Sequence, residues 1–458
     1  MNRYQLARLM GAALGLISAA TAHAQSAATA AAETAQAAAP MVAETMDKGD
    51  TAWMMTSTLL VLLMILPGLA LFYGGLVRSK NMLSVMTQIG ASAALAMLIW
   101  VAYGYSLAFG PDGAAGLTPF IAGFGKAFLT GVTPASTAAT FTKGVVIPEY
   151  VFVSFQMTFA AITAALVLGS VVERMKFAAV MVFVAIWLTI VYFPIAHMVW
   201  AAGGLFFEMG ALDFAGGTVV HINAGVSALV ACLILGKRIG YQKEALAPHS
   251  LTMTAIGTGL LWVGWFGFNA GSALEANGSA GLAMINTFVA TAAGGLVWMA
   301  VERIVGHKGS ALGFCSGIIA GLVAVTPAAG NSGPMGAIIL GAVASLVCFF
   351  VVSKVKPKLG FDDALDAFGI HGVGGIVGAL GTAIVYAPQF GGPGDGSTGI
   401  AAQLGVQIMA TLTTIIWASI GTAIAIYAAK AVTGLRVTPD AEREGLDLAE
   451  HGERAYNY

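Results

Sequence analysis

The feature that most constrains this fold is a series of long apolar segments separated by short polar ones. A helix needs about 20 mostly apolar residues to cross a bilayer. Only 9% of the residues are charged, against roughly 25% in a soluble protein, so we expect an all-α polytopic membrane protein. Eleven segments have the required length: 52–75, 82–109, 149–172, 177–201, 216–236, 250–270, 279–301, 310–328, 335–353, 365–387 and 400–429. They predict a transmembrane domain over 52–430 and a tail over 431–458.

The N-terminus has the pattern of a secretory signal peptide. Arg3 and Arg8 flank the start of an apolar run over 9–20, and Ala22-His23-Ala24 fits a small-x-small cleavage site. The apolar run is too short to span a membrane. We therefore expect a signal peptide over 1–24 and a flexible exported tail over 25–51.

Basic residues predict the orientation in the membrane, because cytoplasmic loops are enriched in Lys and Arg. With the mature N-terminus outside, sixteen Lys and Arg residues fall in the inner loops and the C-terminal tail, whereas the outer loops hold Lys126 and Lys143. The C-terminus is therefore expected to be cytoplasmic, in a multi-pass protein of the inner (cytoplasmic) membrane. A net charge of −1 argues against a nucleic-acid partner.

Two histidines fall deep within predicted spans, where an ionisable side chain usually marks a functional site. His221 lies in the fifth span and His371 in the tenth, and each is followed four residues later by a glycine, Gly225 and Gly375. Two halves of five spans each are necessarily inverted relative to one another. We therefore expect an inverted five-helix repeat in which the two histidines meet near the membrane midplane.

The histidine pair allows two interpretations. Neutral imidazoles each offer one donor and one acceptor, so a touching pair forms a polar wire. Alternatively, the pair bridges helices and has only a structural role. A metal site is not expected because no third Cys, His or carboxylate shares their depth. Without a nucleophile or paired carboxylates at that depth, we expect no enzyme, no catalytic residue and no cofactor.

Several aromatic side chains recur at helical spacing. They are Phe155 and Phe159 in the third span, Trp200 at the end of the fourth, and Trp265 and Phe268, with Ser272 on the same face, in the sixth. They are either ordinary core and lipid-facing residues or a cage for a small cation outside a hydrophobic constriction.

Two aspartates and one long loop flank predicted spans, and Asp213 and the loop each allow two interpretations. Asp213 precedes the fifth span and is either an N-cap or a negative charge at the outer mouth. Asp366 resembles an N-cap of the tenth span. The external loop over 110–148, in which prolines disfavour regular structure, either shapes an outer vestibule or simply connects two spans.

Several motifs together resemble the ammonium transporter family (Amt/Mep/Rh). They are Asp213-Phe-Ala-Gly-Gly-Thr-Val-Val-His-Ile-Asn-Ala-Gly225, Pro194-Ile-Ala-His-Met-Val-Trp200, Gly264-Trp-Phe-Gly-Phe-Asn-Ala-Gly-Ser272 and Phe368-Gly-Ile-His371. The resemblance runs from about Ala52 to the end. It implies a homotrimer with one pore in each subunit.

The same resemblance implies roles for individual residues. It implies an outer ammonium site of Trp200, Phe155 and Ser272 supported by Asp213, a gate of Phe159 and Phe268, and a pore lined by His221 and His371 beside Trp265. The expected function is ammonium transport for nitrogen uptake. The cation is captured outside and deprotonated, ammonia passes through the pore, and the proton is either relayed separately or returned.

The C-terminal tail also resembles the family pattern. Val432–Val437 and Glu442–Leu448 are similar to a segment that contacts the cytoplasmic PII signalling protein in bacterial members. A solvated charged tail is the alternative. An ammonium sensor that acts through a PII-type partner is the alternative function.

Overall fold

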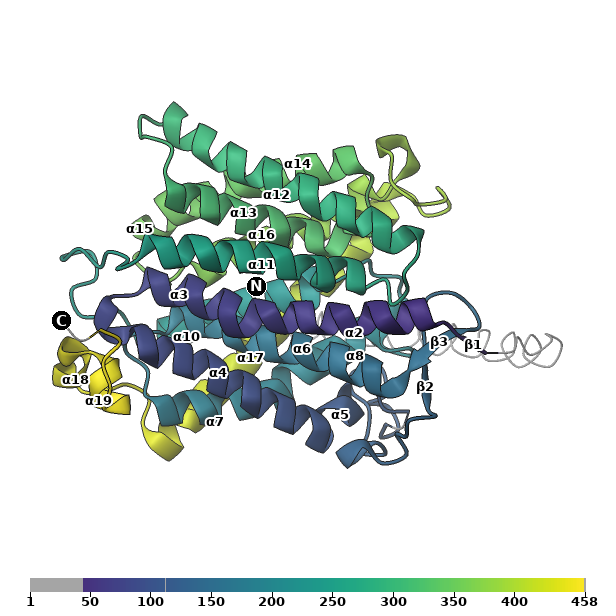
Figure 1. Cartoon of the computed structure of the whole chain (residues 1–458), viewed down its shortest axis with the longest axis horizontal. Helices are drawn as coiled ribbons and strands as arrows, with labels where there is room; N and C mark the ends of the chain where they lie inside the picture. The colour runs from purple at the N-terminus through teal and green to yellow at the C-terminus, as the bar shows by residue number, and fades with distance from the viewer. Residues whose placement is uncertain (1–43, 112, 457–458) are drawn as a thin grey trace, which may run out of the picture. The chain divides into compact units, whose positions relative to one another are not determined.

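The predicted apolar segments form long helices that cross the molecule from end to end (Figure 1). The computed structural model describes residues 44–111 and 113–456, and within them eleven helical segments are long and apolar enough to span a membrane. They are Lys48–Leu76, Ser79–Phe109, Glu149–Ser170, Phe177–Glu208, Gly217–Leu235, Leu251–Gly271, Gly278–Ile304, Ala311–Ala328, Pro334–Leu359, Phe368–Val385 and Ile400–Thr433. The prediction of a polytopic helical protein is confirmed.

The N-terminal expectations fall mostly outside the described residues. The predicted signal peptide over 1–24 and the tail up to residue 43 are not described. The first helix begins at Lys48, capped by the Asp47 carboxylate, so the last four residues of the expected tail over 25–51 are helical. Met46–Tyr458 form one compact unit.

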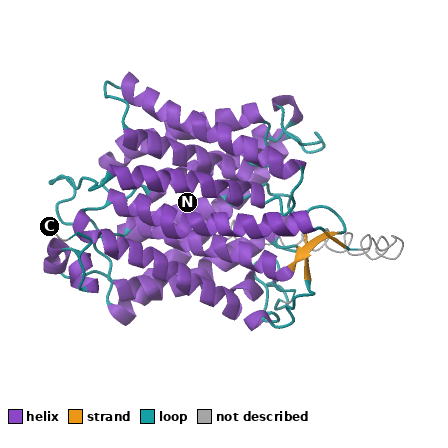
Figure 2. Ribbon diagram, in the orientation of Figure 1, coloured by secondary structure: helices purple, strands orange, loops and turns teal. Residues whose placement is uncertain are grey.

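Most of the secondary structure is α-helical (Figure 2). The α-helices are α2 (Lys48–Leu63), α3 (Ala70–Leu76), α4 (Met82–Ile99), α5 (Tyr105–Phe109), α6 (Glu149–Val167), α7 (Phe177–Trp187), α8 (Phe193–Trp200), α9 (Leu205–Glu208), α10 (Asn223–Leu235), α11 (Leu251–Gly271), α12 (Gly278–Ile304), α13 (Ala311–Val325), α14 (Pro334–Phe350), α15 (Lys356–Leu359), α16 (Val373–Val385), α17 (Ile400–Thr433), α18 (Pro439–Glu444) and α19 (Leu446–His451).

Shorter helical turns and strands complete the secondary structure. The π-helical segments are η1 (Met64–Leu69), η3 (Trp100–Gly104), η6 (Leu188–Tyr192), η7 (Gly217–Ile222), η9 (Val351–Val355) and η10 (Phe368–Gly372). The 3₁₀ turns are η2 (Ser79–Asn81), η4 (Ala127–Leu129), η5 (Leu168–Ser170), η8 (Thr326–Ala328) and η11 (Pro388–Phe390). The strands are β1 (Thr45–Met46), β2 (Thr137–Ala139) and β3 (Val145–Pro148).

The two ends of the helical bundle differ. At one end, here called the sheet end, β2 pairs antiparallel with β3, with Ala138 opposite Ile147 (Figure 1). The loop over 110–148 therefore contains regular structure that its prolines had led us not to expect. At the opposite end, called the tail end, lie α15, α18 and α19 (Figure 1).

A buried network of ion pairs holds the loops together at the tail end. Glu173 pairs with Arg78 and Arg238, and Asp362 pairs with Arg238, at 2.8–2.9 Å. Burial raises the pKa of a carboxyl, but at Glu173 the charges of Arg238 and Arg78 outweigh it and hold the pKa below its usual value. These carboxylates are almost fully buried, so their negative charge is stabilised by the guanidinium groups.

The C-terminal tail docks on these loops rather than extending into solvent. The Glu442 carboxylate accepts a hydrogen bond from the Ile239 N–H at 2.7 Å, and the Asp447 carboxylate accepts one from the Ser84 N–H at 2.7 Å, close to the start of α4. Both carboxylates are buried. The alternative of a purely solvated tail is therefore wrong for this segment.

Candidate functional site

The two histidines that the repeat predicted to meet lie in contact at the centre of the bundle. Nδ1 of His221 is 3.2 Å from Nδ1 of His371, and the ring centroids are 5.3 Å apart at an interplanar angle of 25°. Both rings are buried, with exposed fractions of 1% and 5%. Since two unprotonated nitrogens repel at this distance, one of the facing nitrogens carries a hydrogen and donates it to the other.

Each histidine belongs to a π-helical segment that opens a span. His221 lies in η7 and His371 in η10, and such segments widen the helix locally and frequently occur at functional sites. Each segment is capped by an aspartate eight residues before its histidine. Asp213 accepts hydrogen bonds from the Thr218 and Val219 N–H groups, and the Asp363 carboxylate accepts from Ala367, Phe368 and Gly369.

The cap of the tenth span corrects the sequence interpretation of Asp366. That residue was expected to be the N-cap, but the capping carboxylate is Asp363, while Asp366 forms an ion pair with Lys356. The reason is the π-helical start of η10, which aims three consecutive N–H groups back at Asp363. The equal spacing from Asp213 to His221 and from Asp363 to His371 was visible in the sequence and was missed.

Glycines allow the two helices to cross closely at the histidines. A Cβ atom on Gly225 would lie 2.1 Å from the Gly372 nitrogen, and one on Gly375 would lie 3.0 Å from Cβ of His221. Real Cβ atoms do not approach backbone as closely as 2.1 Å, so a side chain at Gly225 would separate the helices. The glycine that follows each histidine by four residues therefore positions the opposite helix.

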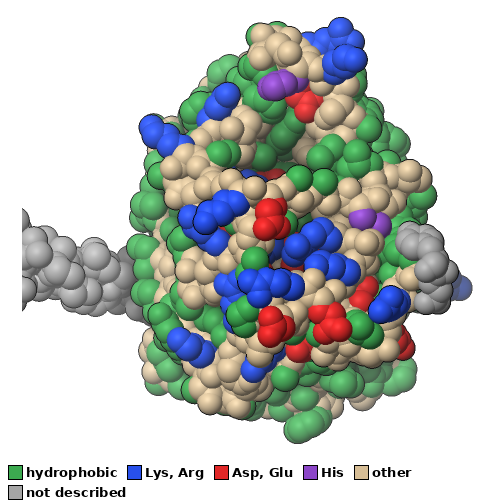
Figure 3. Space-filling model, turned by 90° about the vertical axis from the view of Figure 1, so that its left-hand side faces the viewer, with side chains coloured by type: hydrophobic (Ala, Val, Ile, Leu, Met, Phe, Trp, Pro, Cys, Tyr) green, Lys and Arg blue, Asp and Glu red, His purple; other side chains and the backbone are tan. Residues whose placement is uncertain are grey.

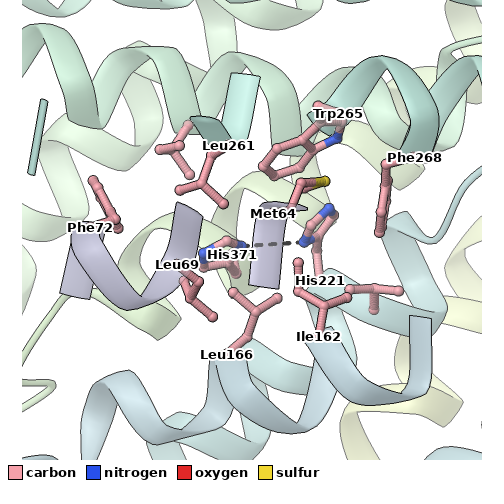
Figure 4. A pocket seen from close by; sticks show the side chains of 12 residues that line it. Met64, Leu69, Phe72, Ile162, Leu166, His221, Leu261, Trp265, Phe268 and His371 are labelled. Carbon is pink, nitrogen blue, oxygen red and sulfur yellow. Dashed lines mark hydrogen bonds between the residues drawn. The ribbon is translucent and has the colours of Figure 1, made fainter. Parts of the chain in front are cut away.

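A narrow apolar cavity of about 10 Å³ surrounds the histidine pair, which is room for one molecule of the size of water. Its lining comes from several spans: Met64, Leu69, Phe72, Ile162, Leu166, Val220, His221, Leu261, Trp265, Phe268, Ile319 and His371 (Figure 4). The imidazole nitrogens are the main polar atoms at this cavity. Apart from the histidines, Trp265 and Phe268, these residues were missed, because an apolar side chain facing a pore has the same sequence pattern as one facing a core.

Two stacked phenyl rings close the cavity toward the sheet end. Phe159 and Phe268 lie 4.2 Å apart between ring centroids at 19°, and both are buried. Trp265 stacks on His221 at 5.4 Å and donates its indole N–H to the Thr326 hydroxyl at 3.0 Å. The residues assigned by resemblance to the gate and the pore are thus contiguous.

The residues assigned to the outer site lie beyond the phenyl pair. Phe155 contacts Phe159 at 4.9 Å, and Trp200 meets Phe159 edge-on at 5.7 Å. Ser272 donates its hydroxyl to the Phe268 carbonyl at 2.8 Å, which leaves its oxygen free to accept. These side chains offer π faces and one acceptor to a cation, but no ionised group.

Asp213 supports this group from behind. Its backbone carbonyl accepts the indole N–H of Trp200 at 2.9 Å, while its carboxylate is used by the η7 N–H groups. Burial outweighs these hydrogen bonds and raises the pKa of the Asp213 carboxyl to about 6. Of the two sequence interpretations, the geometry supports the N-cap.

A second, larger cavity lies toward the tail end. A cavity of about 330 Å³ shares Phe72 with the histidine cavity and is lined by Ile370, Ser316, Ser353 and Asp366 among others. Within residues 44–111 and 113–456, no three His, Cys, Asp or Glu side chains lie close enough together to hold a metal ion. Along the bundle, the phenyl pair thus closes the histidine cavity toward the sheet end, the histidine pair lies at the centre, and the larger cavity lies toward the tail end.

Comparisons with known proteins identify the family to which the chain belongs. The model of the Ammonium Transporter Family matches residues 52–456. An "Ammonium transporter" from Aquifex aeolicus is 48% identical over 414 residues, covering 90% of this chain and 94% of that protein. One from Bacillus subtilis is 46% identical over 415 residues, covering 90% and 99%.

Solved structures agree as well. The crystal structure of Candida albicans Mep2 matches with a TM-score of 0.78 at 37% identity, covering 90% of this chain and 91% of that one. A structure named "Sensor Amt Protein" matches with a TM-score of 0.79 at 28% identity, covering 88% and 98%. The resemblance found in the motifs is thereby confirmed: from residue 52 to residue 456, this chain is a member of the ammonium transporter family.

Proposed function

We propose that the chain moves ammonium nitrogen across the membrane by capturing the cation at the sheet end and passing neutral ammonia along the histidine pair. Trp200, Phe155 and Ser272 hold the cation, with Asp213 in support, and Phe159 and Phe268 form the gate at which the proton is removed. The observation that carries this proposal is the pair of touching imidazoles in an apolar cavity the size of one water molecule.

Magnitudes favour ammonia over the intact cation as the species inside the cavity. Transferring an isolated ammonium ion into a medium of low dielectric constant costs on the order of tens of kcal/mol. A desolvated cation–π contact returns about 2 kcal/mol, so a few aromatic rings hold the cation at a wet mouth but do not carry it between stacked phenyls. Potassium is rejected in this scheme because it has no proton to lose.

The two imidazoles provide the polar partners inside the cavity. Nε2 of His221 is buried and has no hydrogen-bond partner among the described residues, so it is free to bond a passing ammonia molecule. The direct contact between the two Nδ1 atoms gives a route along which a proton moves separately from ammonia. Relay of that proton across the membrane makes transport electrogenic.

The orientation follows from charge. Lys and Arg side chains gather on the tail end (Figure 3), and basic loops are retained in the cytoplasm. We therefore propose that the tail end faces the cytoplasm, that the sheet end and the mature N-terminus face outward, and that the membrane is the inner (cytoplasmic) membrane.

Two features of the assembly rest on the family resemblance. We propose a homotrimer, in which each subunit has its own pore because the histidine cavity is enclosed by the spans of one chain. We also propose that the docked tail is a contact site for a PII-type protein. A sensor that signals through such a partner is the second candidate function, favoured by the match to a protein named a sensor.

Currents and uptake measured on the same proteoliposomes test the proposal. An ammonium pulse is applied to purified protein on a solid-supported membrane, and methylammonium uptake is measured in parallel. His221→Leu and His371→Leu are expected to abolish the ammonium-evoked current, because an apolar side chain breaks the imidazole contact. Lys143→Ala, on the exposed outer loop, is the matched control.

Three results distinguish the alternatives. Undiminished currents in both histidine variants, with potassium still excluded, contradict the relay. Wild-type uptake without any current supports passage of ammonia with return of the proton. A folded wild-type protein with neither uptake nor current supports the sensor.

A further inference from the structure

The loop between the second and third spans folds back along the second span. The turn η4 (Ala127–Leu129) packs against η3 (Trp100–Gly104). Gly104 lies five residues before the end of that span at Phe109, about 7.5 Å along the helix axis. The loop segment Phe120–Thr130 therefore runs beside a part of the chain that crosses the bilayer.

A second contact indicates the depth of this segment independently. The ring of Phe124 contacts the ring of Tyr103, with 6.5 Å between centroids. The Tyr103 hydroxyl in turn bonds the Thr189 hydroxyl at 2.9 Å. Thr189 lies in the fourth span, Phe177–Glu208, twelve and nineteen residues from its two ends. Through Tyr103, Phe124 is thus linked to two segments that are each long and apolar enough to span a membrane.

Two large aromatic side chains of the segment are left uncovered. Phe124 is 66% exposed and Phe128 is 79% exposed. The backbone holds Phe128 in the left-handed region at φ 54°, and Leu129 follows at φ 56°, a conformation that is uncommon for bulky side chains. The strained turn projects the Phe128 ring away from the protein, while Leu129 packs inward against the core.

Several polar groups of the segment are paired within the protein, as an environment of lipid favours. The Ser106 hydroxyl accepts from the Lys126 N–H and donates to the Gly123 carbonyl, both at 2.8 Å. The Ala122 N–H donates to the Leu107 carbonyl at 2.9 Å. Lys126, the one charged residue of the segment, forms an ion pair with the nearly buried Glu149.

We propose that Phe120–Thr130 is a membrane anchor in which Phe124 and Phe128 insert into the outer leaflet, at the boundary between acyl chains and headgroups. Phe side chains, like those of Trp and Leu, are found on the apolar side of interfacial segments that bury into the boundary between headgroups and acyl chains. This assigns the loop a third role, besides the vestibule and the plain connector that the sequence suggested.

Lipid is a better occupant than a second copy of the chain. The second span, which the segment contacts, also exposes apolar side chains: Leu98 is 71% and Val101 is 39% exposed. Neither ring lines either of the two cavities described above, and a protein interface requires a complementary, well-packed surface. Fluid acyl chains adapt to any shape.

Spin-label accessibility in proteoliposomes tests the anchor. Phe128→Cys is labelled with a nitroxide, and its collision rates with oxygen, which partitions into lipid, and with a water-soluble nickel chelate are compared. Leu98→Cys is the control within the membrane, and Thr398→Cys, on an exposed loop at the sheet end, is the control in water. The native Cys232, Cys315 and Cys348 are free and buried, so unmodified protein is expected to take up no label.

The expected result is a ratio of oxygen to nickel accessibility several-fold higher at Phe128→Cys than at Thr398→Cys and approaching that at Leu98→Cys. A ratio equal to that at Thr398→Cys places the ring in water and overturns the anchor. Low accessibility to both reagents places the ring against a neighbouring subunit and also overturns it. If Phe128→Cys does not fold, the same accessibility ratio is measured at Phe124→Cys.

Discussion

The fifth and tenth spans begin with the same capping arrangement, but the charged groups around the two starts differ. In both, an aspartate carboxylate caps a π-helical segment whose histidine follows eight residues later. In both, the backbone carbonyl of that aspartate accepts a further hydrogen bond. At Asp213 the donor is the neutral indole of Trp200, and at Asp363 it is the ammonium group of Lys356, at 3.2 Å.

The contacts that the two starts share differ in consequence from the contacts that are specific to each end. The shared cap and crossing place the two imidazoles in contact. At the sheet end the extra donor is an aromatic ring of the proposed cation site. At the tail end it belongs to a charged neighbourhood in which Asp362, adjacent to Asp363, pairs with Arg238. One half of the repeat thus adjoins the proposed cation site, and the other adjoins the contacts between loops and tail.

The largest expected effect comes from forcing the crossing apart. Gly225→Val places side-chain atoms where a Cβ already lies 2.1 Å from backbone, so we expect a loss of about 3 kcal/mol or more in the free energy of unfolding. Gly375→Val, with a closest approach of 3.0 Å, is expected to cost less. Thermal unfolding of the purified protein measures both.

The control for the crossing is a helical glycine with open space around it. Gly259, in α11, has no atom within 4 Å of the position that a Cβ would occupy, and Gly259→Val is expected to leave the unfolding temperature unchanged. Wild-type stability and transport in Gly225→Val would show that the two halves do not depend on this close approach.

A smaller effect is expected from removing either cap. Asp213→Ala and Asp363→Ala each leave buried N–H groups unpaired, and we expect each to cost about 1–2 kcal/mol of unfolding free energy and to slow methylammonium uptake. Asn at either position retains one acceptor and is expected to recover part of the loss. Asp395→Ala, on an exposed loop, is the control. If only one of the two substitutions to alanine lowers the unfolding free energy and the uptake, the two capping arrangements are not equivalent.

The smallest effects are expected from the donors that distinguish the two ends. Trp200→Phe keeps an aromatic ring but removes the hydrogen bond to Asp213, worth about 1 kcal/mol, so we expect a rise of about fivefold in the methylammonium concentration that gives half-maximal uptake. Lys356→Met removes a partly exposed ion pair and is expected to leave that concentration unchanged. Equal shifts of that concentration in Trp200→Phe and Lys356→Met would contradict a difference in role between the two ends.

Sequence reasoning found the architecture and most of the site, with identifiable failures. Hydropathy located all eleven spans, and the two histidines and the aromatic residues lie together where the repeat and the resemblance led us to expect them. Asp366 was taken for a cap because it lies closest to the predicted helix start, whereas a π-helical turn reaches back to Asp363. The apolar residues that line the cavity could not be identified, since hydropathy does not distinguish a side chain that faces a pore from one that faces another helix.

By itself, the sequence determined the number of membrane spans, the family, and the positions of the two histidines in equivalent spans. These properties depend on composition and spacing along the chain, which a linear pattern records. Only the tertiary structure decided that the imidazoles touch, that the phenyl pair closes one side of a cavity the size of one water molecule, and that the loop after the second span folds back along that span. Those properties depend on distances between residues far apart in the chain, which are decided when the helices pack.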